Sequence, residues 1–420
     1  MRILHLLHRS VPGTHGYAIR SEEIVTKQLE SGLEPLVITS PSQAPAGELD
    51  SERSEFIRGV RYFRTCSRIL PPTREVHDES PIKSSLRVFQ NVMLLTEALR
   101  VAQTYRPAVI HGHSPFTCGI IANIVGRRKK IPSVYEMRGL WEDSHTSRHG
   151  ISERSLRYRG VHLLEDIALR GADVCCVICD ALKDELLFRG IPDEKIVVVP
   201  NGVDVTAFIP GPPNIELQRS IGLQDKTVIG YIGSFFHYEG LHLLVQSMVP
   251  LAGEFPELRL LLVGDGEVAP ILRKMADNAG LSDKVLFTGR VPHAEIMDYY
   301  RLCDLMVLPR MDTRETRLVT PLKPLEIMAM GKPLIASDIG GHREIVTENV
   351  NGLLFKSEDV EDLVSTCRYL IENKEFRLDL GARGRQWVQE NRDWRVLIRS
   401  YIRIYNELIA ASHDGLRSNK

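Results

Sequence analysis

A lysine and a glutamate stand three residues apart at the start of an apolar segment, in the run TPLKPLEIMAMGKPLIAS at 320–337. Pro324 suits the first position of a helix, which puts Glu326 in the first turn and lets Gly331 end the helix. The helix dipole stabilises such a glutamate by only about 0.3 to 1 kcal/mol, and it leaves Lys323 unexplained. The pair predicts a basic site for an anion, beside a carboxylate that could accept two hydroxyls.

Polar side chains also follow two predicted strands in the first half of the chain. In VIHGHSPF the predicted strand ends with His111 and His113. A histidine at a strand end can donate a hydrogen bond or shuttle a proton. YEMRGLWEDS places Glu136 and Arg138 after the next strand, beside an aromatic residue. Charges and a ring in one loop suit a hydroxyl-rich molecule. Packed histidines and a salt-bridged surface loop are the alternatives.

A glycine-containing turn follows the first predicted strand, in GTHGYAIRSEE. Gly13 and Gly16 allow close backbone approach, and the helix after them offers free amides to an anion. The turn lacks the Gly-Lys-Ser/Thr of a P-loop and the three glycines of a dinucleotide-binding fingerprint. A plain strand-to-helix turn is the alternative.

These residues need a scaffold, and the chain supplies the same pattern twice. Strands are predicted at 2–7, 34–39, 108–113, 132–137 and 173–178, and again at 226–233, 258–266, 284–289, 304–309 and 332–337. Strands that alternate with helix-length segments indicate parallel sheets with helices on their faces. The fold class is therefore α/β, with two doubly wound Rossmann-like domains facing each other across a cleft. Ligands of such sheets bind at the carboxyl ends of the strands.

Composition narrows the function. A length of 420 residues favours two or three domains, and 53 Lys and Arg against 54 Asp and Glu argue against a polycation that coats nucleic acid. The seven cysteines are scattered among apolar strands, and the C-x-x-C at Cys176 and Cys179 has no second pair at zinc spacing, so we expect no metal and a reducing cytoplasm. No apolar run approaches 18 residues, which predicts a soluble or peripheral protein.

The second half resembles retaining glycosyltransferases of the GT-B superfamily, the glycogen-synthase and sucrose-synthase-like group called family 4. The resemblance rests on motifs that run in family order: PNGVD at 200–204, GYIGSF and YEGLHLL within 230–244, LVGDGE at 262–267, FTGRVPHAEI at 287–296, DLMVLP at 304–309, PLKPLEIMAMGKPLIASDIGGHREIV at 321–346 and NGLLF at 351–355. GSFFHYEGL, TPLKPLE and YEMRGLWEDS resemble bacterial members associated with exopolysaccharide and exosortase loci.

The resemblance implies a role for each matching residue. Glu326 would hold the ribose hydroxyls of a nucleotide sugar, Lys323 would meet its diphosphate, and His113 would contact the donor sugar; these three are the predicted catalytic residues. The predicted nucleotide-sugar site comprises Gly16, Gly233, Ser234, Gly289, Arg290, Val291, Arg310, Lys323, Pro324, Leu325 and Glu326. Glu136 and Arg138 are predicted to bind the acceptor.

Three positions depart from the family pattern. The family has a second glutamate eight residues before Glu326, where this chain has Leu318. The family also has an arginine and a lysine in the first loop of the second domain, where this chain has Ser234 and Glu239. The charge on a leaving diphosphate would then be balanced by Lys323, assisted by a nearby arginine.

The implied activity is retaining transfer of a sugar from a nucleotide-diphosphate sugar to a hydroxyl acceptor in polysaccharide or glycoconjugate synthesis, without metal or cofactor. A sugar-nucleotide epimerase and a non-catalytic partner subunit of the same fold are the alternatives. The expected domains are 1–202, 203–390 and a helix at 391–412 that crosses back to the first domain. Basic runs at 127–130 and 148–160 are compatible with a lipid-linked glycan acceptor and peripheral contact at the cytoplasmic face of an anionic membrane, or with solvated helix faces.

Overall fold

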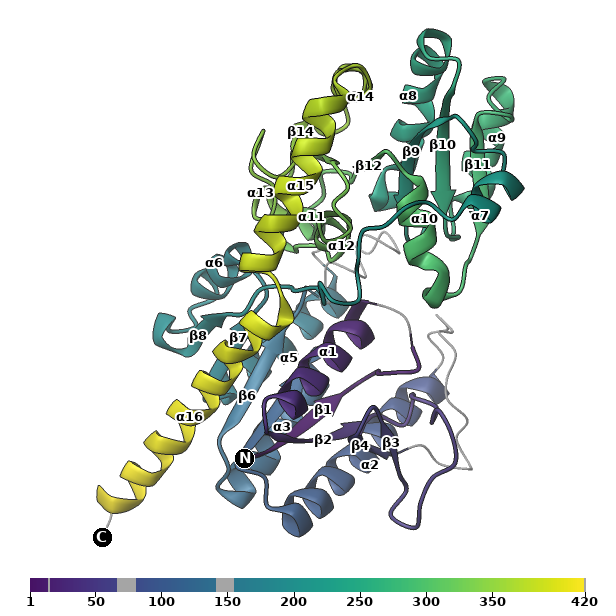
Figure 1. The fold of residues 1–420 in the computed structure, drawn as a ribbon. Coiled ribbons are helices and arrows are strands. Elements are labelled where there is room, and N and C mark those ends of the chain that lie inside the picture. The colour runs from purple at the N-terminus through teal and green to yellow at the C-terminus, as the bar shows by residue number, and fades with distance from the viewer. Residues whose placement is uncertain (14–15, 66–80, 141–154, 419–420) are drawn as a thin grey trace. The chain divides into compact units, whose positions relative to one another are not determined.

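The structure, a computed structural model, describes residues 1–13, 16–65, 81–140 and 155–418, and it divides into two compact units (Figure 1). The first unit comprises Met1–Pro200 together with Trp394–Lys420, and the second comprises Asn201–Asp393. The boundaries predicted at 202 and 390 lie two and three residues from these.

The first unit is a sheet covered by helices. Its strands have the order β3-β4-β2-β1-β5-β6-β7-β8, and every pairing is parallel except that of β3 with β4. The strands are β1 (Arg2–Leu7), β2 (Glu34–Thr39), β3 (Ser54–Ile57), β4 (Val60–Arg64), β5 (Val109–His113), β6 (Ser133–Met137), β7 (Val174–Val177) and β8 (Ile196–Val198). The helices are α1 (Gly16–Glu30), α2 (Pro81–Tyr105), α3 (Phe116–Lys129), α5 (Leu156–Gly171), α6 (Asp180–Phe188), η1 (Asp193–Lys195) and α16 (Trp394–Ser418).

The second unit has a parallel sheet of order β11-β10-β9-β12-β13-β14. Its strands are β9 (Thr227–Ile232), β10 (Leu258–Val263), β11 (Val285–Gly289), β12 (Leu305–Leu308), β13 (Leu334–Ser337) and β14 (Leu353–Phe355). Its helices are α7 (Ile215–Ser220), η2 (His237–Glu239), α8 (Leu241–Glu254), α9 (Ala269–Asn278), η3 (His293–Glu295), α10 (Ile296–Leu302), α11 (Arg314–Leu318), α12 (Lys323–Ala329), α13 (Gly340–Arg343), α14 (Val360–Glu372) and α15 (Lys374–Asn391).

All ten predicted strands form, and the α/β class is confirmed. Most of them are buried along their whole length, as strands of a helix-covered parallel sheet must be, whereas β11 is mostly partly buried. The prediction missed four strands, β3, β4, β8 and β14. The first of these pairs antiparallel at the sheet edge, and β8 and β14 have only three residues each, which is too short for a periodic signal.

Each sheet has a point at which the strand order reverses. In the first unit β1 lies between β2 and β5, and in the second unit β9 lies between β10 and β12. The loops after β1 and β5, and those after β9 and β12, therefore diverge to opposite sides of their sheet. Ligands of doubly wound sheets bind at such points, outside the carboxyl ends of the strands.

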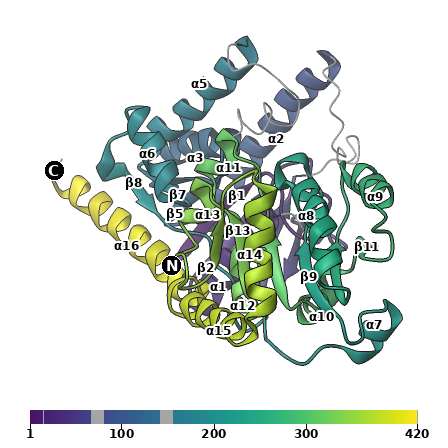
Figure 2. The ribbon, with the colours of Figure 1, turned by 90° about the horizontal axis from the view of Figure 1, so that it is seen from above.

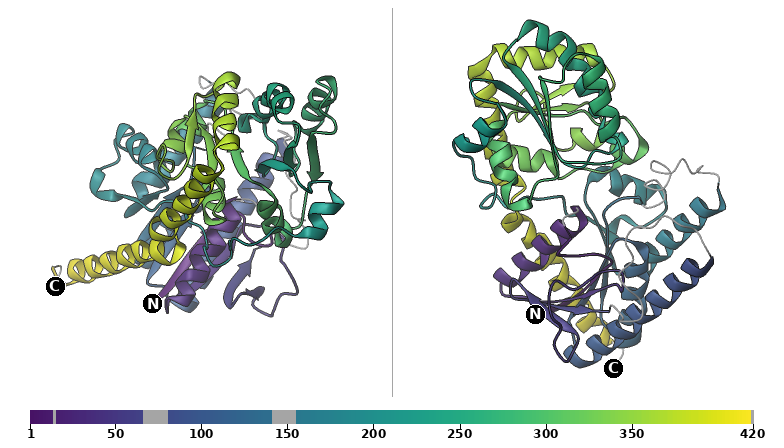
Figure 3. Two further views of the ribbon diagram at one scale, coloured as in Figure 1. Left: turned by 45° about the horizontal axis from the view of Figure 1, so that its top comes forward. Right: turned by 90° about the vertical axis from the view of Figure 1, so that its right-hand side faces the viewer.

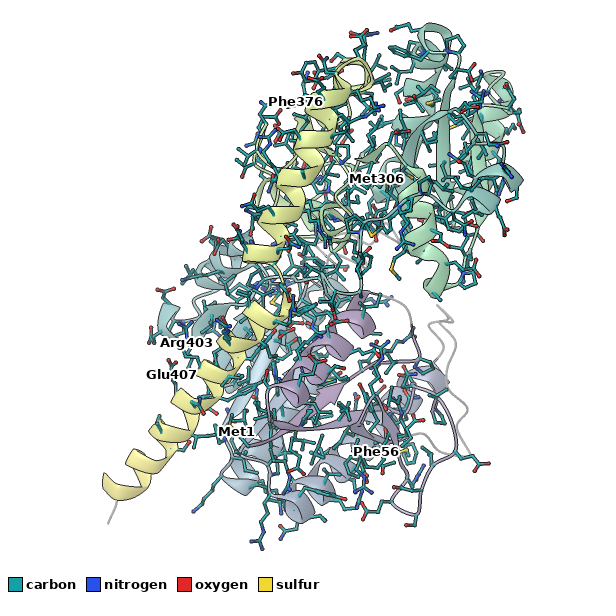
Figure 4. All side chains as sticks on the ribbon, viewed as in Figure 1. Met1, Phe56, Met306, Phe376, Arg403 and Glu407 are labelled. Carbon is teal, nitrogen blue, oxygen red and sulfur yellow. The ribbon has the colours of Figure 1, made fainter. Side chains whose placement is uncertain are left out.

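Helix α16 belongs to the core of the first unit. Its buried side chains include Trp394, Tyr401 and Tyr405, and it packs along α1, as the yellow and purple helices of Figure 3 show. Arg403 and Glu407, labelled on α16 in Figure 4, are exposed on its other face. The helix is amphipathic, so its packing and not its intrinsic propensity holds it in place.

The second unit has one continuous apolar core around its sheet. Helix α14 lies beside α8 in Figure 2, and both contribute leucines to this core. Val203 and Val205, in the segment predicted as a linker, are buried in the same core, and the amide of Val203 donates to the carbonyl of Arg392. The linker-like composition of this segment therefore belongs to a packed turn of the second unit.

Two further predictions concern sulfur and membranes. Cys176 lies inside β7 and Cys179 just before α6; both are buried and neither forms a disulfide, and burial raises the pKa of the Cys176 thiol well above its usual range. Such a thiol is inert packing. No described helix combines the length and the hydropathy that crossing a bilayer requires.

Gly240→Ala tests the loop that joins β9 to α8. Gly240 has φ +68°, and a Cβ atom there would lie 1.9 Å from the carbonyl oxygen of Pro309. We expect the free energy of unfolding to fall by about 3 kcal/mol or more, from backbone strain and overpacking together. Gly222→Ala is the control, since Gly222 has φ +70° with open space at its Cβ; it should cost about 1 kcal/mol. Equal losses in urea denaturation would contradict the close approach to Pro309.

Candidate functional site

A group of buried polar residues lies at the carboxyl ends of β1, β5 and β6 in the first unit. The strand register pairs His5 with His111 and His113 with Glu136, which places these side chains next to one another. All four residues are at most 1% exposed. The position is the reversal point of the sheet, but the side chains point into the protein.

Glu136 is the charged centre of this group. Its Oε1 accepts hydrogen bonds from Nε of Arg138 at 2.6 Å and from Nε of Arg20 at 3.0 Å, and its Oε2 accepts from the hydroxyl of Tyr401. Burial opposes ionisation, but the two guanidinium groups outweigh it and hold the pKa of Glu136 well below its usual range. A paired, ionised carboxylate is the form in which a glutamate can be buried.

The prediction that Glu136 and Arg138 bind an acceptor does not agree with this geometry. Glu136 is fully buried and both of its oxygens are occupied. Arg138 is 4% exposed and donates to the carbonyl of Tyr17 and the hydroxyl of Ser21 as well as to Glu136. Both residues tie β6 to α1.

Arg138 also fixes the hydrogen positions of the histidines. An arginine can only donate, so the 2.6 Å contact between its Nη2 and Nδ1 of His113 makes that nitrogen an acceptor. The ring hydrogen of His113 is then on Nε2, which donates to Nδ1 of His5 at 2.9 Å. Burial is the main cause that lowers the pKa of His113 to about 4 and that of His5 to about 3, so both rings are neutral at pH 7.

The chain of hydrogen bonds continues to α1 and α16. Nε2 of His5 donates to Gln28, whose amide donates to the hydroxyl of Tyr405, and this hydroxyl is hydrogen-bonded to Nδ1 of His111 at 2.8 Å. The other ring nitrogen of His111 is Nε2. That atom has no hydrogen-bond partner, and Oε2 of Glu136 lies 3.6 Å from it.

The three imidazoles are close enough to be considered as metal ligands, since one nitrogen of each lies within 4.8 Å of the others. A metal ion needs an unprotonated nitrogen from each ring. The donation from Arg138 places the hydrogen of His113 on Nε2, the nitrogen that faces His5. The arrangement thus fits a hydrogen-bonded chain and does not fit a metal centre. For His113, predicted to contact a donor sugar, both ring nitrogens are already bonded.

A second group lies at the reversal point of the sheet in the second unit, where Glu239 stands between two cations. Its Oε1 lies 2.6 Å from Nζ of Lys323 and 3.2 Å from Nη2 of Arg310. Glu239 ends η2 after β9, Arg310 follows β12, and Lys323 begins α12. Three separate elements therefore bring these charges together.

Glu239 is 2% exposed and ionised. Burial opposes its charge, but Arg310 and Lys323 lower its pKa to about 2. The side chains of Lys323 and Arg310 are 18% and 12% exposed. Sequence reasoning treated Glu239 only as the loss of a family cation. The joint presence of an unexpected glutamate and an unexpected lysine was the signal that could have paired them.

Glycine and tyrosine form the wall around Lys323. A Cβ atom on Gly233 would lie 2.4 Å from Cε of Lys323, so a larger residue there would displace this side chain from its path across the loop after β9. Nζ of Lys323 lies 5.1 Å from the ring centroid of Tyr231, whose hydroxyl donates to the carbonyl of Ser234. The structure thus brings the predicted residues Gly233, Ser234, Arg310 and Lys323 into one place.

Glu326 lies one turn along α12 from Lys323. Its Oε2 accepts a hydrogen bond from the hydroxyl of Tyr300 at 3.0 Å, and burial raises the pKa of Tyr300 well above its usual range, which keeps that hydroxyl protonated. Glu326 itself is partly exposed, whereas the neighbouring Pro324 and Leu325 are buried and anchor the helix start. A partly exposed carboxylate one helical turn from a lysine can still accept hydroxyl donors.

Four further predicted donor-site residues lie at the end of β11 and, in the first unit, at the start of α1. Gly289 ends β11 with φ +72°, and its carbonyl accepts from the amide of Gly264. Arg290 is exposed and Val291 packs on the core. Gly16 begins α1 in the first unit and is exposed. Trp141 and the acidic residues after it lie outside the described residues.

Comparison with known families covers most of the chain. Residues 15–202 match the model described as a glycosyl transferase 4-like domain, and residues 214–387 match the model described as glycosyl transferases group 1. These are the families expected from the resemblance at the level of the two domains.

Two curated relatives illustrate the range of similarity. A GDP-mannose-dependent α-mannosyltransferase of Corynebacterium glutamicum is 25% identical over 98% of this chain and 90% of its own length. A GDP-mannose-dependent α-(1-6)-phosphatidylinositol monomannoside mannosyltransferase of Mycolicibacterium smegmatis is 26% identical over 49% of this chain. The chain spans 54% of the length of this second protein, and 60% of its Mycobacterium tuberculosis counterparts.

Solved structures share the fold. Sucrose-phosphate synthase of Thermosynechococcus elongatus superposes with a TM-score of 0.76 at 20% identity, covering 98% of this chain and 100% of that one. Anabaena HepE in complex with UDP superposes with a TM-score of 0.72 at 19% identity, covering 97% and 100%. The chain therefore has the GT-B fold with its two Rossmann-like domains.

The buried histidines predict an acid-sensitive first unit. His113 and His5 have lower pKa values in the folded than in the unfolded protein, so unfolding takes up protons below pH 6.5 and stability falls as the pH falls from 6.5 towards 4. At pH 5 the lowered pKa of each histidine should have reduced the free energy of unfolding by about 2 kcal/mol. His113→Gln, whose amide can accept from Arg138 and donate to His5, should lower the pH 7-to-5 loss by about that amount in urea denaturation. His162→Gln on α5 is the control, and identical losses in both variants would contradict the prediction.

Proposed function

We propose that this chain, in which a glycosyl transferase 4-like domain precedes a group 1 glycosyl transferase domain, moves a sugar from a nucleotide-diphosphate sugar to a hydroxyl acceptor with retention of configuration. The observation that carries the proposal is the pair of partly exposed cations, Lys323 and Arg310, held by Glu239 beside the carboxylate of Glu326. A diphosphate needs the cations, and a ribose needs the carboxylate.

The donor would be held by residues of the second unit. Lys323 and Arg310 would meet the diphosphate, and Gly233 and Ser234 would let the backbone approach it closely. Glu326 would accept hydrogen bonds from the ribose hydroxyls. The backbone of residues 289–291 would read the base, and Pro324 and Leu325 would fix the start of α12.

In the proposed reaction the protein acts mainly by stabilising the negative charge that develops on the leaving diphosphate. As the bond from the anomeric carbon to the diphosphate oxygen breaks, that oxygen gathers negative charge and the sugar becomes oxocarbenium-like. The acceptor hydroxyl attacks from the same face, and a phosphate oxygen takes its proton. Fixed cations that strengthen their contacts as this charge develops lower the barrier, and no metal is required if they suffice.

The named relatives support a sugar nucleotide as donor and leave the base open. Two of them are called GDP-mannose-dependent, whereas the Anabaena structure contains UDP. We therefore propose both nucleotides as candidates. The resemblance of short motifs to exopolysaccharide-associated proteins supports glycan synthesis as the setting.

A panel of nucleotide sugars tests the activity. The purified chain is incubated with GDP-mannose, UDP-glucose and other donors, with and without polyprenyl-linked sugars, in EDTA. We expect free nucleoside diphosphate from one donor and a glycosylated product of retained configuration. Glu326→Ala should weaken nucleoside diphosphate binding by about tenfold or more, since each bond to a carboxylate contributes about 1.5 to 3 kcal/mol. An isomerised donor would support the epimerase instead, and binding without turnover would support a partner subunit.

Lys323→Gln tests the balance of charge on the diphosphate. Turnover should fall by about 10² to 10³-fold, while donor affinity falls less, because the contact strengthens in the transition state. Lys356→Gln is the matched control, since Lys356 is 78% exposed at its side chain in the same unit. Activity abolished by EDTA and restored by magnesium, or normal turnover of Lys323→Gln, would refute the metal-independent mechanism.

A lipid-linked acceptor and peripheral membrane contact are the remaining parts of the proposal. The outer face of α5 exposes Leu156, Leu163 and Ile167 at 85%, 60% and 48%, at helical spacing. Arg157 and Arg159 are exposed on the same helix, and α3, which packs against α5, ends in the run 127–130. Apolar side chains flanked by arginines are typical of a helix that lies on an anionic bilayer.

Co-sedimentation with vesicles tests this contact. We expect the wild type to bind vesicles that contain anionic lipid, because basic residues near such a surface are attracted to it, and we expect Leu163→Ser/Ile167→Ser to bind several-fold less. Leu378→Ser/Ile271→Ser is the matched control, because these residues are 61% and 60% exposed on α15 and α9. Equal binding of both double variants, or none by the wild type, would contradict a role for α5.

A further inference from the structure

We propose that Glu239 is a positioning residue for the donor diphosphate, which holds the ammonium group of Lys323 and the guanidinium group of Arg310 side by side before the donor arrives. The inference rests on the proposed function. The diphosphate would then meet a preassembled pair of cations, and no side chain would have to move to collect its charge.

The backbone fixes the place of Glu239. Gly240, the next residue, approaches the carbonyl of Pro309 so closely that a Cβ atom would lie 1.9 Å from it. The amide of Met311 donates to the carbonyl of Tyr238 at 2.9 Å. The turn that carries Glu239 is thus clamped on both sides to the segment after β12, which carries Arg310. The carboxylate cannot drift away from that arginine.

The side-chain geometry gives Glu239 more than an ion-pair role. Arg310 reaches it through two nitrogens, Nη2 to Oε1 at 3.2 Å and Nε to Oε2 at 3.4 Å, and the ring of Tyr238 lies under the guanidinium group at 5.6 Å. Lys323 shares the same Oε1. Two cations that share one carboxylate would repel each other without it, since like charges a few ångströms apart are unfavourable in a partly buried site.

Glu239 also accounts for the charge of Lys323. Burial lowers the pKa of Lys323, and Arg310 lowers it further, whereas Glu239 is the main group that raises it and Glu326 adds less. The remaining neighbours are neutral: burial raises the pKa of Tyr231 well above its usual range. His342 of α13 is also buried, and burial first, then Arg310, lower its pKa to about 3. Removing Glu239 therefore removes the main group that keeps Lys323 protonated.

Calorimetric binding of UDP and of GDP between pH 7 and pH 9 tests the inference. We expect Glu239→Gln to bind the preferred nucleotide about tenfold more weakly than the wild type at pH 7. A further loss should appear as the pH is raised to 9, because without Glu239 burial and Arg310 lower the pKa of Lys323 with less opposition than in the wild type, and its charged fraction falls as the pH rises. The wild type should show little change over this range.

Rescue by a permanently charged side chain separates this role from a merely structural one. In Glu239→Gln/Lys323→Arg the pH dependence should disappear, since arginine stays protonated throughout. Glu254→Gln, an exposed glutamate of α8 paired with Arg368, is the matched control and should bind like the wild type. If Glu239→Gln does not fold, Glu239→Asp carries the test and should bind several-fold more weakly at every pH, without pH dependence.

The outcomes distinguish this inference from the proposed function. A Glu239→Gln protein that binds nucleotide as tightly as the wild type at every pH, or a Glu239→Asp protein with unchanged affinity, would overturn the positioning role while the proposed transfer stands. A wild type that binds neither UDP nor GDP would overturn the proposed donor site, and this inference with it.

Discussion

A buried carboxylate between two cations stands at the reversal point of each sheet, and the polar part of each unit is arranged around it. A buried glutamate is tolerated only when it is paired and hydrogen-bonded, because an isolated ion loses several kcal/mol or more of hydration. Glu136 meets this requirement with two arginines, and Glu239 meets it with Lys323 and Arg310. Each carboxylate thereby fixes side chains from elements that are far apart in the sequence.

The two groups differ in whether their cations can still bind a further ligand. In the first unit Arg138 donates hydrogen bonds to Glu136, His113, Ser21 and a backbone carbonyl, and its side chain is 3% exposed. In the second unit the side chain of Lys323 is 18% exposed, and the two oxygens of Glu239 serve both of its cations. The first group therefore stabilises a strand end, whereas the second can exchange or add a ligand.

Sequence reasoning predicted ten of the strands because each is a short, largely apolar run, a local signal. It also selected Lys323, Arg310 and Gly233, which the structure gathers into one place. It placed Glu136 on an acceptor surface because a charged residue after a strand has no local mark of burial. The burial of Glu136 depends on α1 and on α16. Tyr401 of α16 lies 265 residues further along the chain, and its hydroxyl donates to the carboxylate. Such long-range cover is not encoded in a short motif.

Glu239 departs from the pattern expected of the family, and Lys323 is one of the two cations that pair with it. Where relatives of this kind are expected to carry a cation in the loop after β9, this chain has an anion, and a lysine reaches the same loop from α12, across Gly233. Lys323 begins α12, and the buried residues Pro324 and Leu325 anchor the start of this helix. A cation at such a helix start is held more rigidly than one on a loop. A rigid charge needs less reorganisation when a diphosphate departs, which is the condition under which fixed groups replace a metal ion. The anion in the loop pairs with this lysine and is the main group that raises its pKa, so the two residues are coupled in both position and charge.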